Sequence, residues 1–216
     1  LPRARRASGR ANVRVPILTY HYIRVYSDPH DLLGQRLSVS PTDLDQQLAF
    51  LRRRGFTTVT LDVLRRDREG IAMPRKPIIL TFDDGYVDAY TTALPILRRY
   101  DATATFYVVS GFVGTPGYLT WPQVMALANA GMTIGAHSVT HSDLTLLRPG
   151  DLWREVFECR LELERHLGRP VVHFAYPGGR WNPTVRGIVQ QVGYATATTT
   201  EPGVVAGDAD LLRLPR

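Results

Sequence analysis

Ile78-Ile79-Leu80-Thr81-Phe82-Asp83-Asp84-Gly85 is an apolar run that ends in two adjacent carboxylates and a glycine. A continuous apolar run before a turn signal is typical of a strand that is buried on both faces of a parallel sheet. Neighbouring side chains of a regular strand point to opposite faces, so Asp83 and Asp84 reach one pocket only if the chain turns there. Gly85 supplies the freedom to turn because it lacks a Cβ. The stretch therefore predicts a buried strand that delivers acidic groups to the rim of a pocket.

Two histidines four residues apart occur further along the chain, in His137-Ser138-Val139-Thr140-His141. Together with one carboxylate they make a three-ligand site for a divalent metal, with a position left for water. The second carboxylate is then available as a base toward that water. The alternatives are a turn or helix cap for Asp-Asp-Gly and two surface histidines around a polar turn. We favour the metal site because the apolar strand, the paired carboxylates and the paired histidines occur together.

Predicted strands and helices alternate along the rest of the chain. Ser40-Pro41-Thr42-Asp43 is typical of a helix start, with a serine cap, a proline in the first turn and an acidic residue three positions on. Residues 1–14 lack apolar periodicity and are interpreted as a flexible arm before a single domain of residues 15–216, in which residues 24–37 have the composition of a loop. The predicted strands are 15–18, 57–61, 78–82, 104–109, 133–136, 171–176 and 195–199, and the predicted helices are 40–54, 89–100, 120–130, 151–167 and 183–192. This alternation predicts an α/β fold with a parallel sheet, closed as a barrel or open and doubly wound.

Polar groups follow the ends of several of these predicted strands. His21 follows the first strand, the two aspartates follow 78–82, the histidine pair follows 133–136, and Pro177-Gly178-Gly179 follows 171–176. In a barrel of parallel strands the reactive groups cluster at the carboxyl ends of the strands. We therefore expect these groups to share one site.

The bulk composition narrows the class of protein. The chain has 216 residues, 44% of them apolar, which suits one domain with a sizeable core. Basic residues outnumber acidic ones by 26 to 20, and Lys76 is the single lysine. We interpret this charge as a habit of composition and expect no nucleic-acid partner, because no basic run is interleaved with aromatic residues. The single cysteine, Cys159, excludes an intrachain disulfide and reads as a small buried group on a helix.

The motifs together resemble those of a known family, the polysaccharide deacetylases (the NodB-homology domain of carbohydrate esterase family 4). Thr-Phe-Asp-Asp-Gly and His-Ser-x-x-His are similar to its first two motifs. Val15-Pro16-Ile17-Leu18-Thr19-Tyr20-His21 resembles its opening strand, Phe174-Ala175-Tyr176-Pro177-Gly178-Gly179 its third motif, and Leu212-Arg213-Leu214-Pro215-Arg216 its last. The resemblance covers residues 15–216 and implies a distorted (β/α) barrel with about seven parallel strands.

The resemblance also implies an activity and a role for each residue. It implies an enzyme, a hydrolase that removes N-acetyl groups from an amino-sugar polysaccharide and releases acetate. Asp83 resembles the catalytic base, and Asp84, with His137 and His141, resembles the ligand set of a divalent metal. Zinc is the expected ion, although nitrogen and oxygen ligands also admit cobalt and nickel. The backbone N–H of Gly178 is the candidate for stabilising the oxyanion of the tetrahedral intermediate.

The chain departs from the family in its expected general acid. Many members supply a histidine from the last motif, but this chain has no histidine after His173. Tyr20-His21 resembles a branch of the family that acts on exopolysaccharide poly-N-acetylglucosamine. We therefore expect His21 to be the general acid or a substrate contact, with a structural histidine as the alternative. His30, His166 and His173 are assigned to a loop, a helix surface and strand packing.

A second departure concerns the arginine that pairs with the catalytic aspartate in the family. Ala175 stands at its usual position, and Arg180, Arg213 and Arg216 are the candidates to replace it. The tryptophan-bearing fourth motif is also absent around 194–200. Tyr176 either lines the sugar site or is a buried tyrosine.

Two other functions remain open from sequence alone. One is a non-catalytic glycan-binding relative, and the other is a metal hydrolase of a small amide or cyclic imide. The expected partner is an N-acetylated glycan, and the expected location is extracytoplasmic or in the cell envelope. No apolar run approaches the ~20 residues of a membrane helix, and residues 1–14 show no signal-peptide core.

Overall fold

The computed structural model describes residues 14–68 and 72–216. The predicted arm therefore lies outside the described residues, apart from Arg14. The elements follow one another as β1 (Ile17–Tyr20), β2 (Tyr22–Ile23), α1 (Leu32–Leu37), β3 (Ser38–Val39), α2 (Pro41–Arg53), β4 (Thr57–Thr58), α3 (Asp62–Arg68), β5 (Pro77–Phe82), η1 (Ala89–Ala93), α4 (Leu94–Arg99), β6 (Thr105–Val108), η2 (Ser110–Phe112), α5 (Trp121–Asn129), β7 (Thr133–Ala136), η3 (Leu144–Leu146), α6 (Pro149–Leu167), β8 (His173–Ala175), η4 (Pro177–Gly179), α7 (Pro183–Val192) and β9 (Thr196–Thr198).

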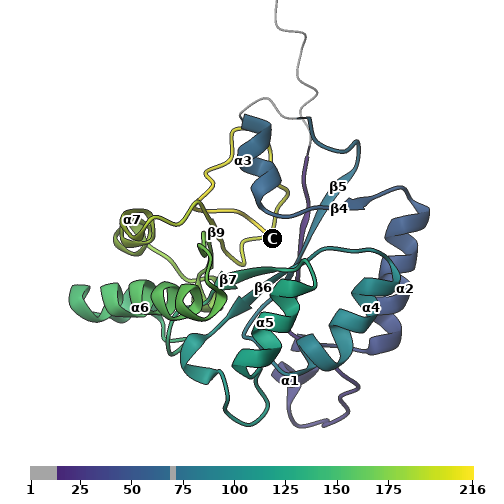
Figure 1. Ribbon diagram of the computed structural model, residues 1–216, viewed down its shortest axis with the longest axis horizontal. Helices are drawn as coiled ribbons and strands as arrows, with labels where there is room; N and C mark the ends of the chain where they lie inside the picture. Colours follow the sequence, from purple (N-terminus) through teal and green to yellow (C-terminus); the bar gives the residue numbers. More distant parts are fainter. Residues whose placement is uncertain (1–13, 69–71) are drawn as a thin grey trace, which may run out of the picture.

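One seven-stranded sheet organises the fold. Its strands run in the order β1-β5-β6-β7-β8-β9, and β4 pairs with the beginning of β5. All of these pairs are parallel. The sheet curls into a half-barrel: in Figure 1 the strands lie around the C-terminus, with α2, α4, α5, α6 and α7 outside them. The prediction of a distorted α/β barrel with about seven parallel strands is confirmed.

Side chains of β5 alternate between two hydrophobic clusters, as the twofold period of a strand requires. Ile78, Leu80 and Phe82 pack in the large cluster that includes the helices. Ile79 belongs to a smaller cluster inside the curl of the sheet, together with Val15, Ile17, Leu61, Leu64, Tyr107, Ala175, Val205 and Leu214. Because residues 79, 81 and 83 share one face, Asp83 continues the row of side chains that points into the interior.

The predicted helix cap at Ser40 is confirmed. The Ser40 hydroxyl accepts a hydrogen bond from the N–H of Asp43 at 3.0 Å and so begins α2. α6 buries a stripe with helical spacing and ends at Gly168, whose φ of 64° is left-handed. Cys159 lies in that stripe with 0% exposure, in agreement with its interpretation as a small buried group.

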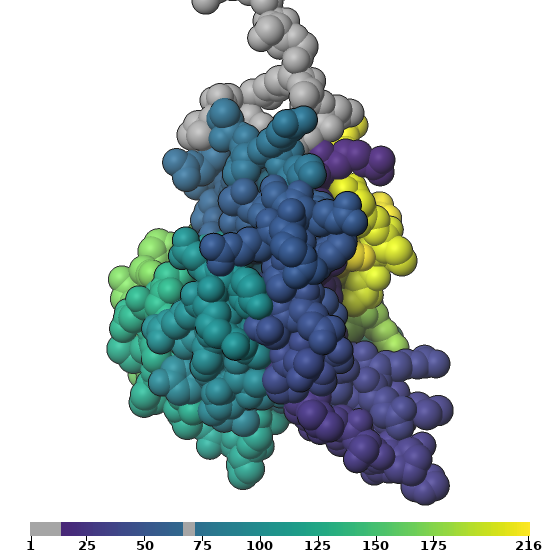
Figure 2. Space-filling model, turned by 90° about the vertical axis from the view of Figure 1, so that its right-hand side faces the viewer, coloured from purple at the N-terminus to yellow at the C-terminus, as the bar shows by residue number. Residues whose placement is uncertain are grey.

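The structure differs from the prediction on both sides of α2. Residues 24–37 were expected to form a loop but include α1, because Asp31 accepts hydrogen bonds from the N–H of Gly34 at 2.8 Å and the hydroxyl of Tyr26 at 2.7 Å. This part of the chain projects from the lower end of the molecule in Figure 2. The predicted strand 57–61 is shortened to β4, and its last residue, Leu61, turns into the interior cluster just before α3.

The predicted helix 89–100 is also divided into η1, which has π-helical hydrogen bonding, and α4. Pro95 explains the division, since it has no N–H to donate and its ring crowds the carbonyl four residues earlier. The wider π turn before it relieves that contact. Throughout residues 14–68 and 72–216, no helix is both long enough and apolar enough to cross a membrane.

Candidate metal centre

The chain turns directly at the carboxylate pair. Pairing with β1 continues as far as Asp83, whose N–H donates to the carbonyl of Tyr20 at 2.9 Å. Asp84 then takes a φ of 70° and Gly85 a φ of 76°. Aspartate is one of the few residues besides glycine that visits this left-handed region. The turn was expected at Gly85, whereas in the structure it begins one residue earlier, and so both carboxylates lie beside histidines of the predicted site.

Asp84, His137 and His141 converge on one point. The Oδ1 atom of Asp84 lies 3.3 Å from Nε2 of His137 and 3.3 Å from Nε2 of His141. One ligand atom from each of the three residues lies within 4.8 Å of the other two. Zinc bound tetrahedrally at about 2.1 Å separates neighbouring ligand atoms by about 3.4 Å. The observed spacing therefore fits an ion of this size.

A buried acceptor at this point supports the same conclusion. Oδ1 of Asp84 is buried and has no hydrogen-bond partner among the described residues. An unpartnered buried carboxylate oxygen is costly, and a cation would satisfy it. Burial alone would raise the pKa of Asp84, but the two imidazoles beside it hold that pKa well below its usual range. The donor set thus fits a divalent cation.

The orientation of the His137 ring follows from its surroundings. Its Nδ1 atom lies 2.8 Å from the backbone carbonyl of Ala175 at the end of β8, and the side chain is 2% exposed. A carbonyl oxygen only accepts, so Nδ1 donates to it and Nε2 is left to face Asp84 and the site. A histidine held this way is oriented and made more basic as a metal ligand. Sequence reasoning missed the role of Ala175, because a backbone carbonyl leaves no side-chain signal.

The two histidines are presented by a loop and not by one face of a helix. Ser138 and His141 have φ angles of 63° and 59°. The Ser138 hydroxyl accepts a hydrogen bond from the N–H of His141 at 2.9 Å, which closes the turn between the two ligands. The residue that stands between the ligands thus stabilises their arrangement.

Asp83 forms a bidentate ion pair with Arg216. Nη1 and Nη2 of Arg216 lie 2.7 Å from Oδ1 and 2.7 Å from Oδ2 of Asp83, with side-chain exposures of 1% and 3%. Nε of Arg216 donates to the carbonyl of Thr199 at 2.7 Å, and this fixes the guanidinium plane. Burial would raise the pKa of Asp83, but the Arg216 guanidinium outweighs it and holds that pKa below its usual range. Asp83 is therefore ionised at neutral pH.

This ion pair selects one of the three arginines that the sequence left open. Arg213 bonds Glu201 at 3.0 Å, and Arg180 bonds Asp143 at 2.6 Å; both arginines are largely solvated. Arg216 reaches Asp83 because the last residues run beside β9, where the N–H of Leu214 donates to the carbonyl of Ala197 at 2.8 Å.

His21 lies on the other side of Asp83. It follows β1, its side chain is 22% exposed, and its Nε2 atom lies 4.0 Å from Oδ2 of Asp83. The imidazole is therefore close to the carboxylate and in contact with solvent. The structure thus brings five of the predicted side chains together: Asp83, Asp84, His137, His141 and His21.

The remaining predicted residues take different places. Gly178 is exposed and follows β8, with a φ of 58°. Tyr176 is fully buried, and its hydroxyl donates to the carbonyl of Leu212 at 2.8 Å, so it is the buried tyrosine of the two alternatives. His173 in β8 is buried, and its Nδ1 atom lies 2.8 Å from the hydroxyl of Thr196 in the neighbouring strand β9. His166 stacks on Trp121 on the helix surface, and His30 is exposed in a turn.

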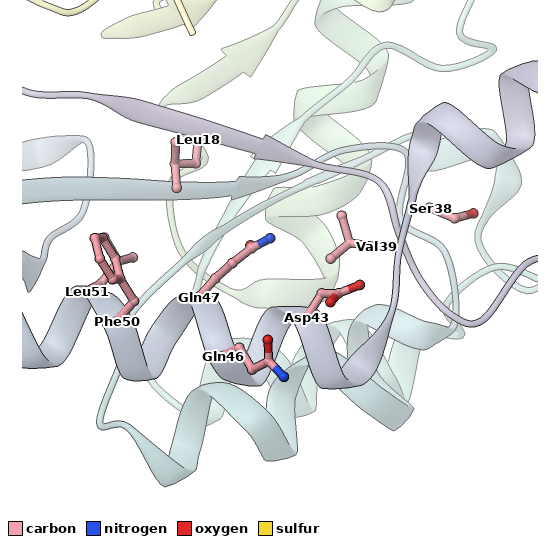
Figure 3. A pocket seen from close by; sticks show the side chains of 8 residues that line it. All are labelled: Leu18, Ser38, Val39, Asp43, Gln46, Gln47, Phe50 and Leu51. Atoms are coloured by element: carbon pink, nitrogen blue, oxygen red, sulfur yellow. The ribbon is translucent and has the colours of Figure 1, made fainter.

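A groove of about 580 Å³ lies between α2, β1 and β3, and its lining includes none of the residues of the metal centre. Figure 3 shows its lining, which consists of Leu18, Ser38, Val39, Asp43, Gln46, Gln47, Phe50 and Leu51. Its single carboxylate, that of Asp43, already accepts a hydrogen bond from the Ser40 hydroxyl at 2.7 Å. None of the predicted site residues lies in this groove, so the metal centre remains the candidate active site.

Comparison with known protein families agrees with this geometry. A sequence profile of the polysaccharide deacetylases ("Polysaccharide deacetylase") matches residues 70–197. The putative polysaccharide deacetylase YxkH of Bacillus subtilis is 28% identical over 94% of this chain and 70% of its own length. The poly-β-1,6-N-acetyl-D-glucosamine N-deacetylase of Escherichia coli K12 is 33% identical over 44% of this chain, a match that spans 16% of that protein.

Solved structures extend the similarity to the whole fold. The Streptococcus pyogenes deacetylase PplD, in complex with acetate, superposes with a TM-score of 0.88 and 33% identity, covering 95% of this chain and 92% of that one. IcaB from Ammonifex degensii gives a TM-score of 0.79 and 27% identity, covering 94% of this chain and 90% of that one.

Proposed function

Since the chain belongs to the polysaccharide deacetylase family, we propose that it hydrolyses the N-acetyl groups of an amino-sugar polysaccharide and releases acetate. We also propose that the reaction depends on zinc held by Asp84, His137 and His141. The observation that carries the proposal is the convergence of three ligand atoms within 4.8 Å, next to a second, buried carboxylate. Cobalt or nickel would suit the same ligands.

The chain's own groups supply the proton transfers of this reaction. When bound, a zinc ion polarises the acetyl carbonyl and lowers the pKa of water toward ~7. Asp83 is the proposed general base: it is kept ionised by Arg216 and takes a proton from the attacking water. Arg216 also holds the carboxylate in one orientation through two hydrogen bonds of 2.7 Å.

The oxyanion and the leaving amine need their own partners. Gly178 is exposed at the end of β8, next to the strand end that orients His137, and its N–H is the proposed donor to the oxyanion. His21 is the proposed general acid, because the departing amine must gain a proton and His21 lies 4.0 Å from the base.

The features around the site agree with a sugar polymer as substrate. A groove of about 390 Å³ is lined by Tyr22, Tyr86 and Tyr118 among others. Tyr86 is only two residues from Asp84 in the sequence. Aromatic walls with a few polar groups are typical of small-molecule sites. Two of the relatives carry the name poly-β-1,6-N-acetyl-D-glucosamine N-deacetylase, and this similarity favours an N-acetylglucosamine polymer as the substrate of this chain. Because those polymers are extracellular or part of the cell envelope, we expect the protein to act outside the cytoplasm, which cell fractionation would test.

A panel of N-acetylated oligosaccharides tests the function, with acetate release measured with and without a zinc chelator. We expect release from at least one amino-sugar oligomer and none in chelator. Stoichiometric zinc without turnover on any oligomer or aryl acetate would indicate a glycan-binding protein instead. Turnover of small amides or cyclic imides alone would indicate a metal hydrolase of such small substrates.

We expect His21→Ala to lower kcat about 10²-fold on N-acetylated oligosaccharides but less than about threefold on 4-nitrophenyl acetate. The amine leaves only when it is protonated, whereas 4-nitrophenolate leaves without a proton. Steady-state kinetics on both substrates measure the difference.

His30→Ala is the matched control, because His30 is an exposed histidine in a turn. The His30→Ala variant should have the wild-type kcat on both the oligosaccharide and 4-nitrophenyl acetate. Equal losses on the amide and the ester in His21→Ala would contradict the role of acid and assign His21 to binding or structure.

A further inference from the structure

The segment 137–141, here called the histidine loop, carries both metal-ligating histidines in a strained conformation. Its residues Ser138 and His141 have φ angles of 63° and 59°. Residues other than glycine keep such angles only where the surrounding structure over-determines them. His137 is additionally placed by the end of β7 and the carbonyl of Ala175. His141 is the last residue of the loop, so its position depends on what holds the loop in shape.

One side of the histidine loop is held through its carbonyl groups. The N–H of Ser110 donates to the carbonyl of Ser138 at 3.2 Å, and the N–H of Gly111 donates to the carbonyl of Val139 at 2.9 Å. A Cβ at position 111 would lie 2.5 Å from that carbonyl oxygen. The backbone of η2 therefore fits against this side as closely as a glycine allows.

The other side is held through its N–H groups by one carboxylate, that of Glu155 on α6. Oε2 of Glu155 accepts from the N–H of Val139 at 2.9 Å and from the N–H of Thr140 at 2.9 Å. Oε1 accepts from the hydroxyl of Thr140 at 2.7 Å. Successive N–H groups in a turn form a concavity suited to an anion, and bonds to a charged acceptor are stronger than neutral ones.

We infer that Glu155 is a positioning residue for the metal centre: its carboxylate holds the histidine loop in the conformation that aims His141 at Asp84. The inference rests on the metal site of the proposed function. It does not depend on the substrate, because Glu155 acts through the backbone of the loop. Glu155 belongs to neither the predicted ligand set nor the predicted acid and base.

Zinc titration of the metal-free protein, in competition with a chromogenic chelator, tests the inference. We expect Glu155→Ala to weaken zinc binding about 10–100-fold, the range that follows loss of an outer hydrogen bond that orients a metal site. Glu155→Gln keeps one acceptor oxygen and should lose less. Glu158→Ala is the matched control: Glu158 is an exposed glutamate on the same helix, 3.6 Å from Arg154, and its removal should leave zinc binding unchanged.

A second readout separates positioning from general stability. In the metal-free protein the amides of Val139 and Thr140 should exchange faster in Glu155→Ala than in the wild type, while the core strands keep their protection. A folded Glu155→Ala that binds zinc within twofold of the wild type would overturn the inference. If that variant does not fold, Glu155→Gln and Thr140→Val decide, and zinc affinity within twofold in both would overturn it. Because no substrate is used, failure to release acetate refutes the proposed function and leaves this result standing.

Discussion

Replacing Asp83 by asparagine is expected to lower kcat for N-deacetylation about 10²–10⁴-fold while the protein still binds one zinc ion. Asparagine has nearly the shape of aspartate but cannot take a proton from water. The three metal ligands are untouched by the change, and Arg216 keeps its bonds to the Thr199 carbonyl and the Thr81 hydroxyl. Steady-state kinetics and metal analysis on the same folded sample measure the two effects.

His137→Ala is the contrasting variant and should lose both zinc and activity. Removal of its imidazole deletes a ligand atom 3.3 Å from Oδ1 of Asp84. Equal activity in the wild type and Asp83→Asn would contradict the assignment of the base. Loss of zinc from a folded Asp83→Asn would indicate that Asp83 is itself a ligand.

The second large effect is expected at Arg216, where Arg216→Met should destabilise the fold by about 3–5 kcal/mol. The substitution leaves Asp83 as a buried charge without its main partner, and the effect of burial, which raises the pKa of that carboxyl, is then opposed only by the weaker effects of His137 and His21. The base must be ionised to accept a proton, so activity falls as the pH drops through this pKa. Arg216 lowers the pKa, and its removal therefore moves the acidic limb of the pH–rate profile to higher pH.

Denaturant unfolding and a pH–rate profile measure these two changes. Arg213→Ala is the control: Arg213 is 46% exposed and pairs with Glu201, an ion pair of the kind that contributes about 0–1 kcal/mol. It should leave the acidic limb unchanged. If Arg216→Met kept the wild-type limb, the carboxylate at 83 would not be the titrating base.

The centre of the sheet was predictable because β5 and β6 are buried along their whole length and their sequences contain runs of apolar residues. β7 and α7 have the predicted bounds, and Ser40 begins α2 through a bond between neighbours in sequence. Such signals are local, so the sequence alone carries them. The carboxylate pair and the histidine pair were predictable for a related reason, since each follows the end of a strand in a parallel sheet.

The failures have two causes. α1 is held by local bonds, in which Tyr26 and Gly34 both bond Asp31, but the loop-like composition of this segment concealed the cap. The other failures depend on contacts between distant residues. The choice of Arg216 over two other arginines depends on the pairing of Leu214 with Ala197 beside β9. Glu155 reads as an ordinary helix residue, and only the packing of α6 against the histidine loop gives it a partner.

The most direct test of a single metal centre is a zinc titration of the metal-free protein with acetate release followed at each step. Acetate release should rise linearly and reach its plateau at one zinc per chain, and Asp84→Ala should neither bind the ion nor gain activity. Full activity in the metal-free protein, or an unchanged titration in Asp84→Ala, would contradict a cation held by Asp84 and the two histidines.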